Sequence, residues 1–207
     1  MYNTLTVGRK CYNGRMDVVV IAPGEDHSPA LALANSRHNS PAGTVDRIVG
    51  PAEATAWLVE RGLLPAGTAI SAARLDALHE LRDAVRAVLV ARIKGSAPPE
   101  RAVEIVNRAA AAAPAAPVLS WPVPDRPASY PRPVGGDALD RALAAVAGDA
   151  IDAVCGERAA LLLECEAPGC VRLLEKDHSR RRWCSTACGD RVRAARYYAR
   201  HRRDPAR

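Results

Sequence analysis

The chain of 207 residues is 48% hydrophobic and 25% charged, a balance that is typical of a folded soluble protein and excludes a disordered chain or an integral membrane protein. It contains no Phe and only 4% aromatic residues, so Leu, Val and Ala must fill the core, which favours helices packed closely on Ala. The net charge of +6 is concentrated in residues 172–207, which contain 12 Lys and Arg and 4 Asp and Glu. The first 171 residues contain 17 Lys and Arg and 19 Asp and Glu, so they form a nearly neutral body.

The N-terminal region contains two short apolar runs, at residues 18–22 and 31–34, on either side of the turn-like segment PGEDHSP. The first run is far too short for the core of a signal peptide, and no later stretch approaches a membrane span. We therefore expect a cytoplasmic protein that is not inserted in a membrane. We interpret the two runs as a short strand pair.

Two helices follow. Pro51 opens a short amphipathic helix that ends before Gly62. The strongest helical pattern runs from Ser71 as N-cap to Gly95 as the C-terminal stop, with one apolar stripe and a polar face that includes Arg82.

The second half of the body has a weaker helical pattern of apolar residues. A third helix is predicted from Pro99 through the alanine run that ends at residue 113, after which repeated prolines predict a loop with a short strand at 118–123. Asp137 is the predicted N-cap of a fourth helix, and a short helix from Glu157 leads toward the first of four clustered cysteines.

These elements predict an α+β protein of two units. The first, residues 1–156, is a mainly α-helical body with a short N-terminal strand pair. The second, residues 160–207, is a small four-cysteine module that ends in a basic helix.

The four cysteines of this module, Cys165, Cys170, Cys184 and Cys188, form two close pairs separated by a loop. This spacing brings four thiolates to the corners of a tetrahedron, the arrangement that a structural Zn²⁺ adopts, and Gly169 supplies a tight turn. Disulfides are disfavoured in the cytoplasm, and four thiolates leave no open position for a catalytic water. We therefore predict one structural zinc ion, with buried or redox-active cysteines as the alternative.

The helix that follows the last cysteine has two faces at helical spacing. One is a narrow apolar stripe of Cys188, Val192, Ala195 and Ala199, which we expect to pack on the zinc module. The other is basic. The candidate nucleic-acid contacts are Arg180, Arg181, Arg182, Arg191, Arg193, Arg196, Arg200, Arg202 and Arg203.

A helix face whose charged residues are almost all arginine favours binding to phosphate, because a face that only contacts solvent usually mixes acidic and basic residues. The alternatives are a solvent-exposed face, an acidic protein partner or a membrane surface.

The module resembles the CGNR zinc finger. It has the paired cysteines, a basic-Trp-Cys-Ser run at 181–185, and the Cys-Gly-Asn-Arg element at 188–191. In this chain Asp190 stands where that element has Asn, which adds a negative charge.

The body looks like the ABATE domain that accompanies this finger in bacterial proteins described as stress-induced transcription regulators. The resemblance rests on Leu-Ala-Asn-Ser at 33–36, Ala-Trp-Leu at 56–58 with Gly-Leu at 62–63, and Leu-Arg-Asp-Ala at 81–84, in this order. It implies a transcription regulator with an N-terminal sensor or interaction domain.

The leading hypothesis is a DNA-binding transcription regulator that is not an enzyme. The sequence contains no P-loop or Gly-x-Ser-x-Gly motif, and its His residues are scattered. The alternative is a small-molecule sensor or enzyme-like body whose zinc finger docks on a protein or RNA. Asn35 and Arg82 are candidate ligand contacts for an unknown effector, against the simpler roles of a turn cap and a helix-packing arginine. The oligomeric state is left open.

Overall fold

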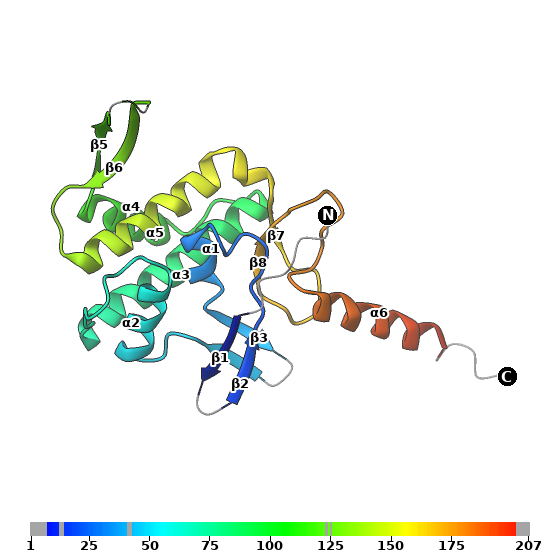
Figure 1. Ribbon diagram of the computed structural model, residues 1–207. Helices are drawn as coiled ribbons and strands as arrows, with labels where there is room; N and C mark the ends of the chain where they lie inside the picture. Colours follow the sequence, from blue (N-terminus) through cyan, green and yellow to red (C-terminus); the bar gives the residue numbers. More distant parts are fainter. Residues whose placement is uncertain (1–7, 13–14, 41–42, 123, 125, 202–207) are drawn as a thin grey trace.

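The computed structural model describes residues 8–12, 15–40, 43–122, 124 and 126–201, and for residues 8–12 and 15–19 it gives the backbone path alone. Helices α3 (Ala72–Lys94), α4 (Glu100–Ala112) and α5 (Ala138–Cys155) pack against one another and form the centre of the body (Figure 1). The short helix α1 (Pro29–Ala34) contacts both α3 and α5, and α2 (Pro51–Glu60) contacts α3.

The core consists of Leu, Val and Ala, as predicted. Leu78, Leu81 and Val85 of α3 are buried, and α5 contributes Ala147 and Ala150, both fully buried. The small alanine side chains let α5 approach α3 and α4 closely, which compensates for the lack of Phe.

The helix ends lie where local capping signals predict them. Helix α3 begins after Ser71 and ends at Gly95, which adopts the left-handed conformation with φ 64°. Helix α5 begins after Asp137, whose carboxylate accepts a hydrogen bond from the backbone N–H of Asp140, while the Asp140 carboxylate accepts one from the N–H of Asp137.

A strand pair lies near the N-terminus, as predicted, but it does not join the two apolar runs that were assigned to it. The pair consists of β1 (Gly8–Tyr12) and β2 (Arg15–Val19), so β2 overlaps the first apolar run. The second run is α1, because the Ser28 hydroxyl accepts a hydrogen bond from the Leu31 N–H at 3.2 Å and caps the helix. A short run that is buried on all sides has no periodicity to distinguish helix from strand.

The proline-rich segment after α4 is a hairpin of β5 (Ala115–Ser120) and β6 (Ala128–Pro133), which projects from the body (Figure 1). The sequence predicted only a strand at 118–123 within a loop. A two-stranded ribbon tolerates Pro because each strand has a free edge, where a missing N–H breaks no ladder bond.

The module follows α5 through the short helix η1 (Glu157–Ala160). It contains the hairpin of β7 (Leu162–Glu164) and β8 (Leu173–Glu175), and helix α6 (Thr186–His201). Successive residues of β8 face different cores: Leu173 packs in the core of the body and Leu174 in a small core around the cysteines.

A last hairpin, β3 (Arg37–Ser40) with β4 (Gly43–Asp46), lies between α1 and α2 in the chain. The fold is thus the predicted α+β arrangement, a mainly helical body with a four-cysteine module that ends in a basic helix. No helix of the described ranges has the length and apolar character needed to cross a membrane.

Candidate metal centre and nucleic-acid interface

The predicted metal ligands are brought together by three local structures. Cys165 follows β7, Cys170 precedes β8 after a tight turn, and Cys184 and Cys188 lie just before and within the first turn of α6. Gly169 has φ 74°, a conformation that favours glycine, so it permits the turn that positions Cys170.

The sulfur geometry fits one tetrahedral ion. Cys170 Sγ lies 3.8 Å from Cys184 Sγ, which lies 3.6 Å from Cys188 Sγ, and the four sulfurs are all within 4.8 Å of one another. Zinc–sulfur bonds of about 2.3 Å place tetrahedral sulfurs about 3.8 Å apart. The donor set is closed, so a metal here has a structural role.

Four thiolates this close together need a compensating cation. The pKa of Cys184 is raised above its ordinary value, first by its hydrogen bond with Cys165 and then by the bond with Cys170 and by burial. Its backbone N–H donates to Cys165 Sγ at 3.4 Å, and Arg191 Nη2 donates to Cys188 Sγ at 3.6 Å. These donors and the positive end of α6 offset part of the charge of four thiolates around a divalent ion.

The Gly of the Cys-Gly element has a packing role. A Cβ at Gly189 would lie 2.9 Å from Trp183, so only glycine lets this ring lie against α6. On the same face of α6, Val192 is buried in the core around the cysteines. The metal site, Trp183 and Val192 therefore fix the first two turns of α6.

Beyond Val192, α6 leaves the module and projects into solvent (Figure 1). The expected packing of the apolar stripe on the module holds for Cys188 and Val192 but not for Ala195 and Ala199, which are exposed. The stripe is in contact only at its first two positions, because the module is too small to cover the rest of the helix.

Four of the candidate arginines are engaged within the module. Arg191 contacts Cys188 as described above. Arg193 pairs with the Asp190 carboxylate, and its guanidinium carbon lies 5.7 Å from the centre of the Trp183 ring. Arg181 and Arg182 also form ion pairs, with Asp177 and Glu166 respectively. Asp190 thus partly neutralises the basic face.

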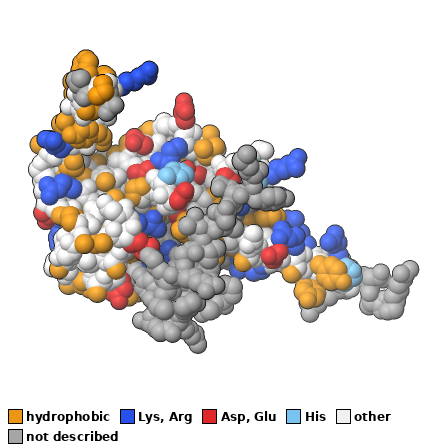
Figure 2. Space-filling model, in the orientation of Figure 1, with side chains coloured by type: hydrophobic (Ala, Val, Ile, Leu, Met, Phe, Trp, Pro, Cys, Tyr) orange, Lys and Arg blue, Asp and Glu red, His pale blue; other side chains and the backbone are white. Residues whose placement is uncertain are grey.

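Three other candidates are exposed and have no polar partner among the described residues: Arg180, Arg196 and Arg200. Figure 2 shows basic side chains along α6 on the viewed side of the molecule. The remaining candidates, Arg202 and Arg203, lie outside the described residues.

Comparison with protein families decides what these two parts are. Residues 27–157, more than half of the chain, match the ABATE model, described as putative stress-induced transcription regulator. The chain belongs to the ABATE family. Residues 162–201 match the CGNR zinc finger, which together with the four-sulfur geometry defines a single structural zinc site. No curated protein matches the chain in a sequence comparison.

A buried polar network fixes the CGNR finger on the ABATE domain. The Asn35 side chain donates to Leu173 O at 2.7 Å and accepts from Leu173 N at 2.8 Å, as a neighbouring strand would. It also donates to Glu25 Oε1 at 2.7 Å, and Arg172 Nη2 donates to the same oxygen at 2.9 Å. Glu25, Asn35 and Arg172 are all buried.

A second group of charges extends this interface from β8 to α5. Glu175 accepts from Arg158 Nε at 2.9 Å, and its other oxygen lies 2.8 Å from His27 Nε2. Arg158 also pairs with Asp149, which in turn accepts from the Ser28 hydroxyl at 2.6 Å. The Glu175 carboxylate raises the pKa of His27 above its ordinary value through this hydrogen bond.

The two candidate ligand residues of the ABATE domain have different surroundings. The amide of Asn35 is taken up by the finger contacts, and Asn35 is not in the lining of the pocket beside it. Arg82 is only 4% exposed although it was placed on the polar face of its helix, because its Nη1 donates to the Asp46 carboxylate of β4 at 2.8 Å. It does line a pocket, together with Arg86.

Sequence reasoning missed the residues that connect the two domains, namely Glu25, Arg172, Glu175 and Arg86. Glu25 and Arg172 are 147 residues apart, and each looks like an ordinary surface charge in its own segment. A charged residue inside an otherwise apolar strand, as in the Arg-Leu-Leu-Glu run at 172–175, was the only local signal.

Proposed function

We propose that the protein is a DNA-binding transcription regulator, in which the CGNR zinc site and the ABATE domain hold α6 in a fixed orientation and the arginines of α6 contact the phosphates. The protein acts by binding and not by catalysis. Cytoplasmic location is part of the proposal, since reducing conditions keep the four cysteines free to bind zinc.

The observation that carries this proposal is the charge of a helix that projects freely. Between Thr186 and His201 the helix holds four Arg and one acidic residue, Asp190, which is already paired with Arg193. Its outer turns cover no core among the described residues, so its exposure serves no purpose in the fold. A helix with exposed charge of one sign is suited to a polyanionic partner.

The side chains on these outer turns suit a nucleic acid. Arg196 and Arg200 are one turn apart, about 6 Å along the axis, and their planar guanidinium groups can bind phosphate with two hydrogen bonds. Tyr197 and Tyr198 lie beside them and are 53% and 67% exposed. A helix of this kind, about 10–12 Å wide with its side chains, fits the major groove of DNA, which is about 12 Å wide.

The test is a titration of zinc-loaded full-length protein against duplex DNA at several salt concentrations. We expect the double variant Arg196→Gln/Arg200→Gln to flatten the slope of log affinity against log salt by about 1.8, at about 0.9 per phosphate contact. Adding Arg193→Gln should flatten it by less than a further 0.9, because Asp190 already offsets this charge. The matched control, Arg126→Gln/Arg141→Gln, removes two exposed arginines of the body and should leave the slope unchanged.

An unchanged slope in the α6 variant would show that α6 is not the contact surface. The finger would then be a docking module for a protein, the runner-up function. A parallel titration with structured RNA at matched salt separates the two nucleic acids, and tighter binding to RNA would contradict the proposal.

A further inference from the structure

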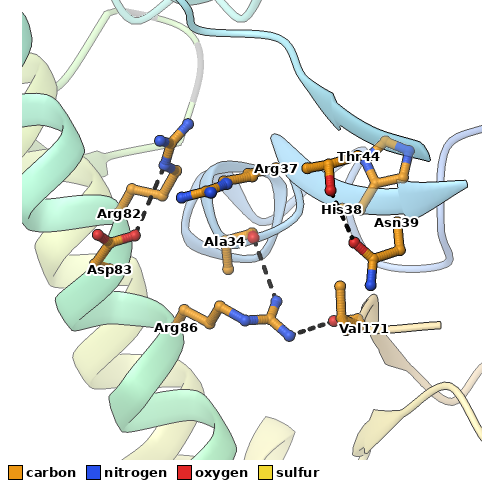
Figure 3. A pocket seen from close by; sticks show the side chains of 9 residues that line it. All are labelled: Ala34, Arg37, His38, Asn39, Thr44, Arg82, Asp83, Arg86 and Val171. Carbon is orange, nitrogen blue, oxygen red and sulfur yellow. Dashed lines mark hydrogen bonds and ion pairs between the residues drawn. The ribbon is translucent and has the colours of Figure 1, made fainter. Parts of the chain in front are cut away.

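A pocket of about 260 Å³ lies where the ABATE domain meets the CGNR finger, apart from α6. Its walls are the β3–β4 hairpin, the end of α1, one face of α3, and Val171 of the finger (Figure 3). The volume is just below the range of about 300–1,000 Å³ that is usual for small-molecule sites, so it suits a ligand of few atoms.

The pocket contains three arginines, and among the described residues only Arg82 forms an ion pair. Arg82 pairs with Asp46, yet its buried Nε has no hydrogen-bond partner. The Nη atoms of Arg86 donate to two carbonyl oxygens, those of Ala34 and Val171, and to no carboxylate. Burial lowers the pKa of Arg86 below its ordinary value, which reflects a cation held partly out of water.

The third arginine is free to bind a ligand. Arg37 is exposed and has no partner in the described part of the chain, and Figure 3 shows its side chain pointing toward the helix that carries Arg82 and Arg86. The only acidic residue in the lining is Asp83, whose side chain is 72% exposed and lies 3.9 Å from Arg82 Nε. The pocket therefore has an excess of positive charge.

The remaining polar lining is neutral. His38 Nδ1 lies 3.0 Å from Asn35 O, and burial lowers the pKa of this imidazole to about 4. His38 is therefore uncharged near neutral pH, donates from Nδ1 and leaves Nε2 as an acceptor. The Thr44 hydroxyl donates to Asn39 at 3.4 Å. These groups can contact a ligand hydroxyl but add no charge.

We propose that this pocket binds a small oxyanion, a metabolite with a phosphate or carboxylate group, through Arg37, Arg82 and Arg86. An anion oxygen accepts hydrogen bonds from the exposed guanidinium of Arg37, and its negative charge compensates the buried cations of Arg82 and Arg86. Two of the cations lie on α3 and the third on β3, and a bound anion reduces the repulsion among them. The site does not depend on the proposed contact between α6 and DNA.

The experiment is isothermal titration calorimetry of zinc-loaded full-length protein with inorganic phosphate and, separately, with succinate. Ionic strength is held constant with potassium chloride, so that general screening gives no signal. We expect saturable binding of at least one anion to one site per chain. Arg37→Gln should weaken it by about tenfold or more, because a charged hydrogen bond is lost.

Two further variants make the test specific. Asp83→Asn removes the acidic group at the rim and should strengthen anion binding by about two- to fivefold. Arg126→Gln, the matched control on the β5–β6 connection, should leave anion affinity unchanged. Because Arg37, Asp83 and Arg126 are exposed, all three variants should keep the wild-type melting temperature, which checks their folding.

Three results would overturn the proposal. One is the absence of saturable binding for both anions, and another is equal anion affinity in wild type and Arg37→Gln. The third is a loss of DNA affinity in Arg37→Gln when neither anion binds, which would make the pocket arginines contacts for DNA phosphate. Arg196→Gln/Arg200→Gln should bind the anion normally, so failure of the α6 hypothesis would be seen separately.

Discussion

Replacing Asn35 by Ala tests whether the finger is held on the ABATE domain by the buried amide. This side chain is 1% exposed and makes three hydrogen bonds of 2.7–2.8 Å, two to the backbone of Leu173 and one to Glu25. The substitution leaves the Leu173 N–H and C=O buried without these partners, at about 1–3 kcal/mol each. Water that enters the small space recovers part of this cost, so we expect a loss of about 3 kcal/mol.

For a chain of this size, such a loss lowers the melting temperature by about 6–12 °C. Urea unfolding followed by circular dichroism measures the free energy, and limited proteolysis detects release of the finger. Asn39→Ala is a matched control, because Asn39 also bridges to the finger, at 3.4 Å to Gly169 O, but is exposed. It should cost less than about 0.5 kcal/mol. If Asn35→Ala costs no more than Asn39→Ala, the amide does not hold the interface.

Three other predictions concern the metal, the apolar side of α6 and the effect of pH. Elemental analysis should find one zinc ion per chain in the wild-type protein and none in Cys170→Ser. A wild-type protein that contains no zinc but has an ordered finger would refute the structural role of the metal. Val192→Asp should destabilise the finger by about 2 kcal/mol or more by placing a carboxylate in its core, whereas the same change at the exposed Ala199 should be nearly neutral in thermal unfolding. His27 has a raised pKa, and its side chain is 57% exposed, so its ion pair with Glu175 should add less than about 1 kcal/mol to the free energy of unfolding. This stabilisation should be fully present below about pH 6.5 and should be lost as the pH rises through the raised pKa of His27. His27→Gln should abolish this part of the pH dependence of urea unfolding, and an identical profile in the variant would contradict the assignment.

The parts of the structure that could be predicted from sequence are those whose cause is local. Ser71, Gly95 and Asp137 mark helix ends because capping depends on residues within one turn. The four cysteines were identified because a metal site needs only two close pairs and a turn between them. The basic face of α6 followed from its spacing and charge, but the projection of its outer turns did not.

The other features depend on contacts between distant segments. The helix α1 was mistaken for a strand, since its identity rests on the Ser28 cap and on burial by α3 and α5. The burial of Arg82 depends on Asp46, which is 36 residues away. The pocket arginines gave no joint signal, because Arg37 and Arg86 lie on elements that only the fold brings together.

The structure also changes the relation between the two units that the sequence suggested. The sequence divides the chain into two units, yet β8 contributes Leu173 to the body core and Leu174 to the finger core. If loss of zinc releases β8, the body loses a fully buried leucine, and Glu25 loses its Arg172 partner. The body should therefore keep its helices after zinc removal but melt at a lower temperature than in the zinc-loaded protein. The finger is thus held on the ABATE domain by packed and hydrogen-bonded groups, and the core of the finger in turn holds the first turns of α6.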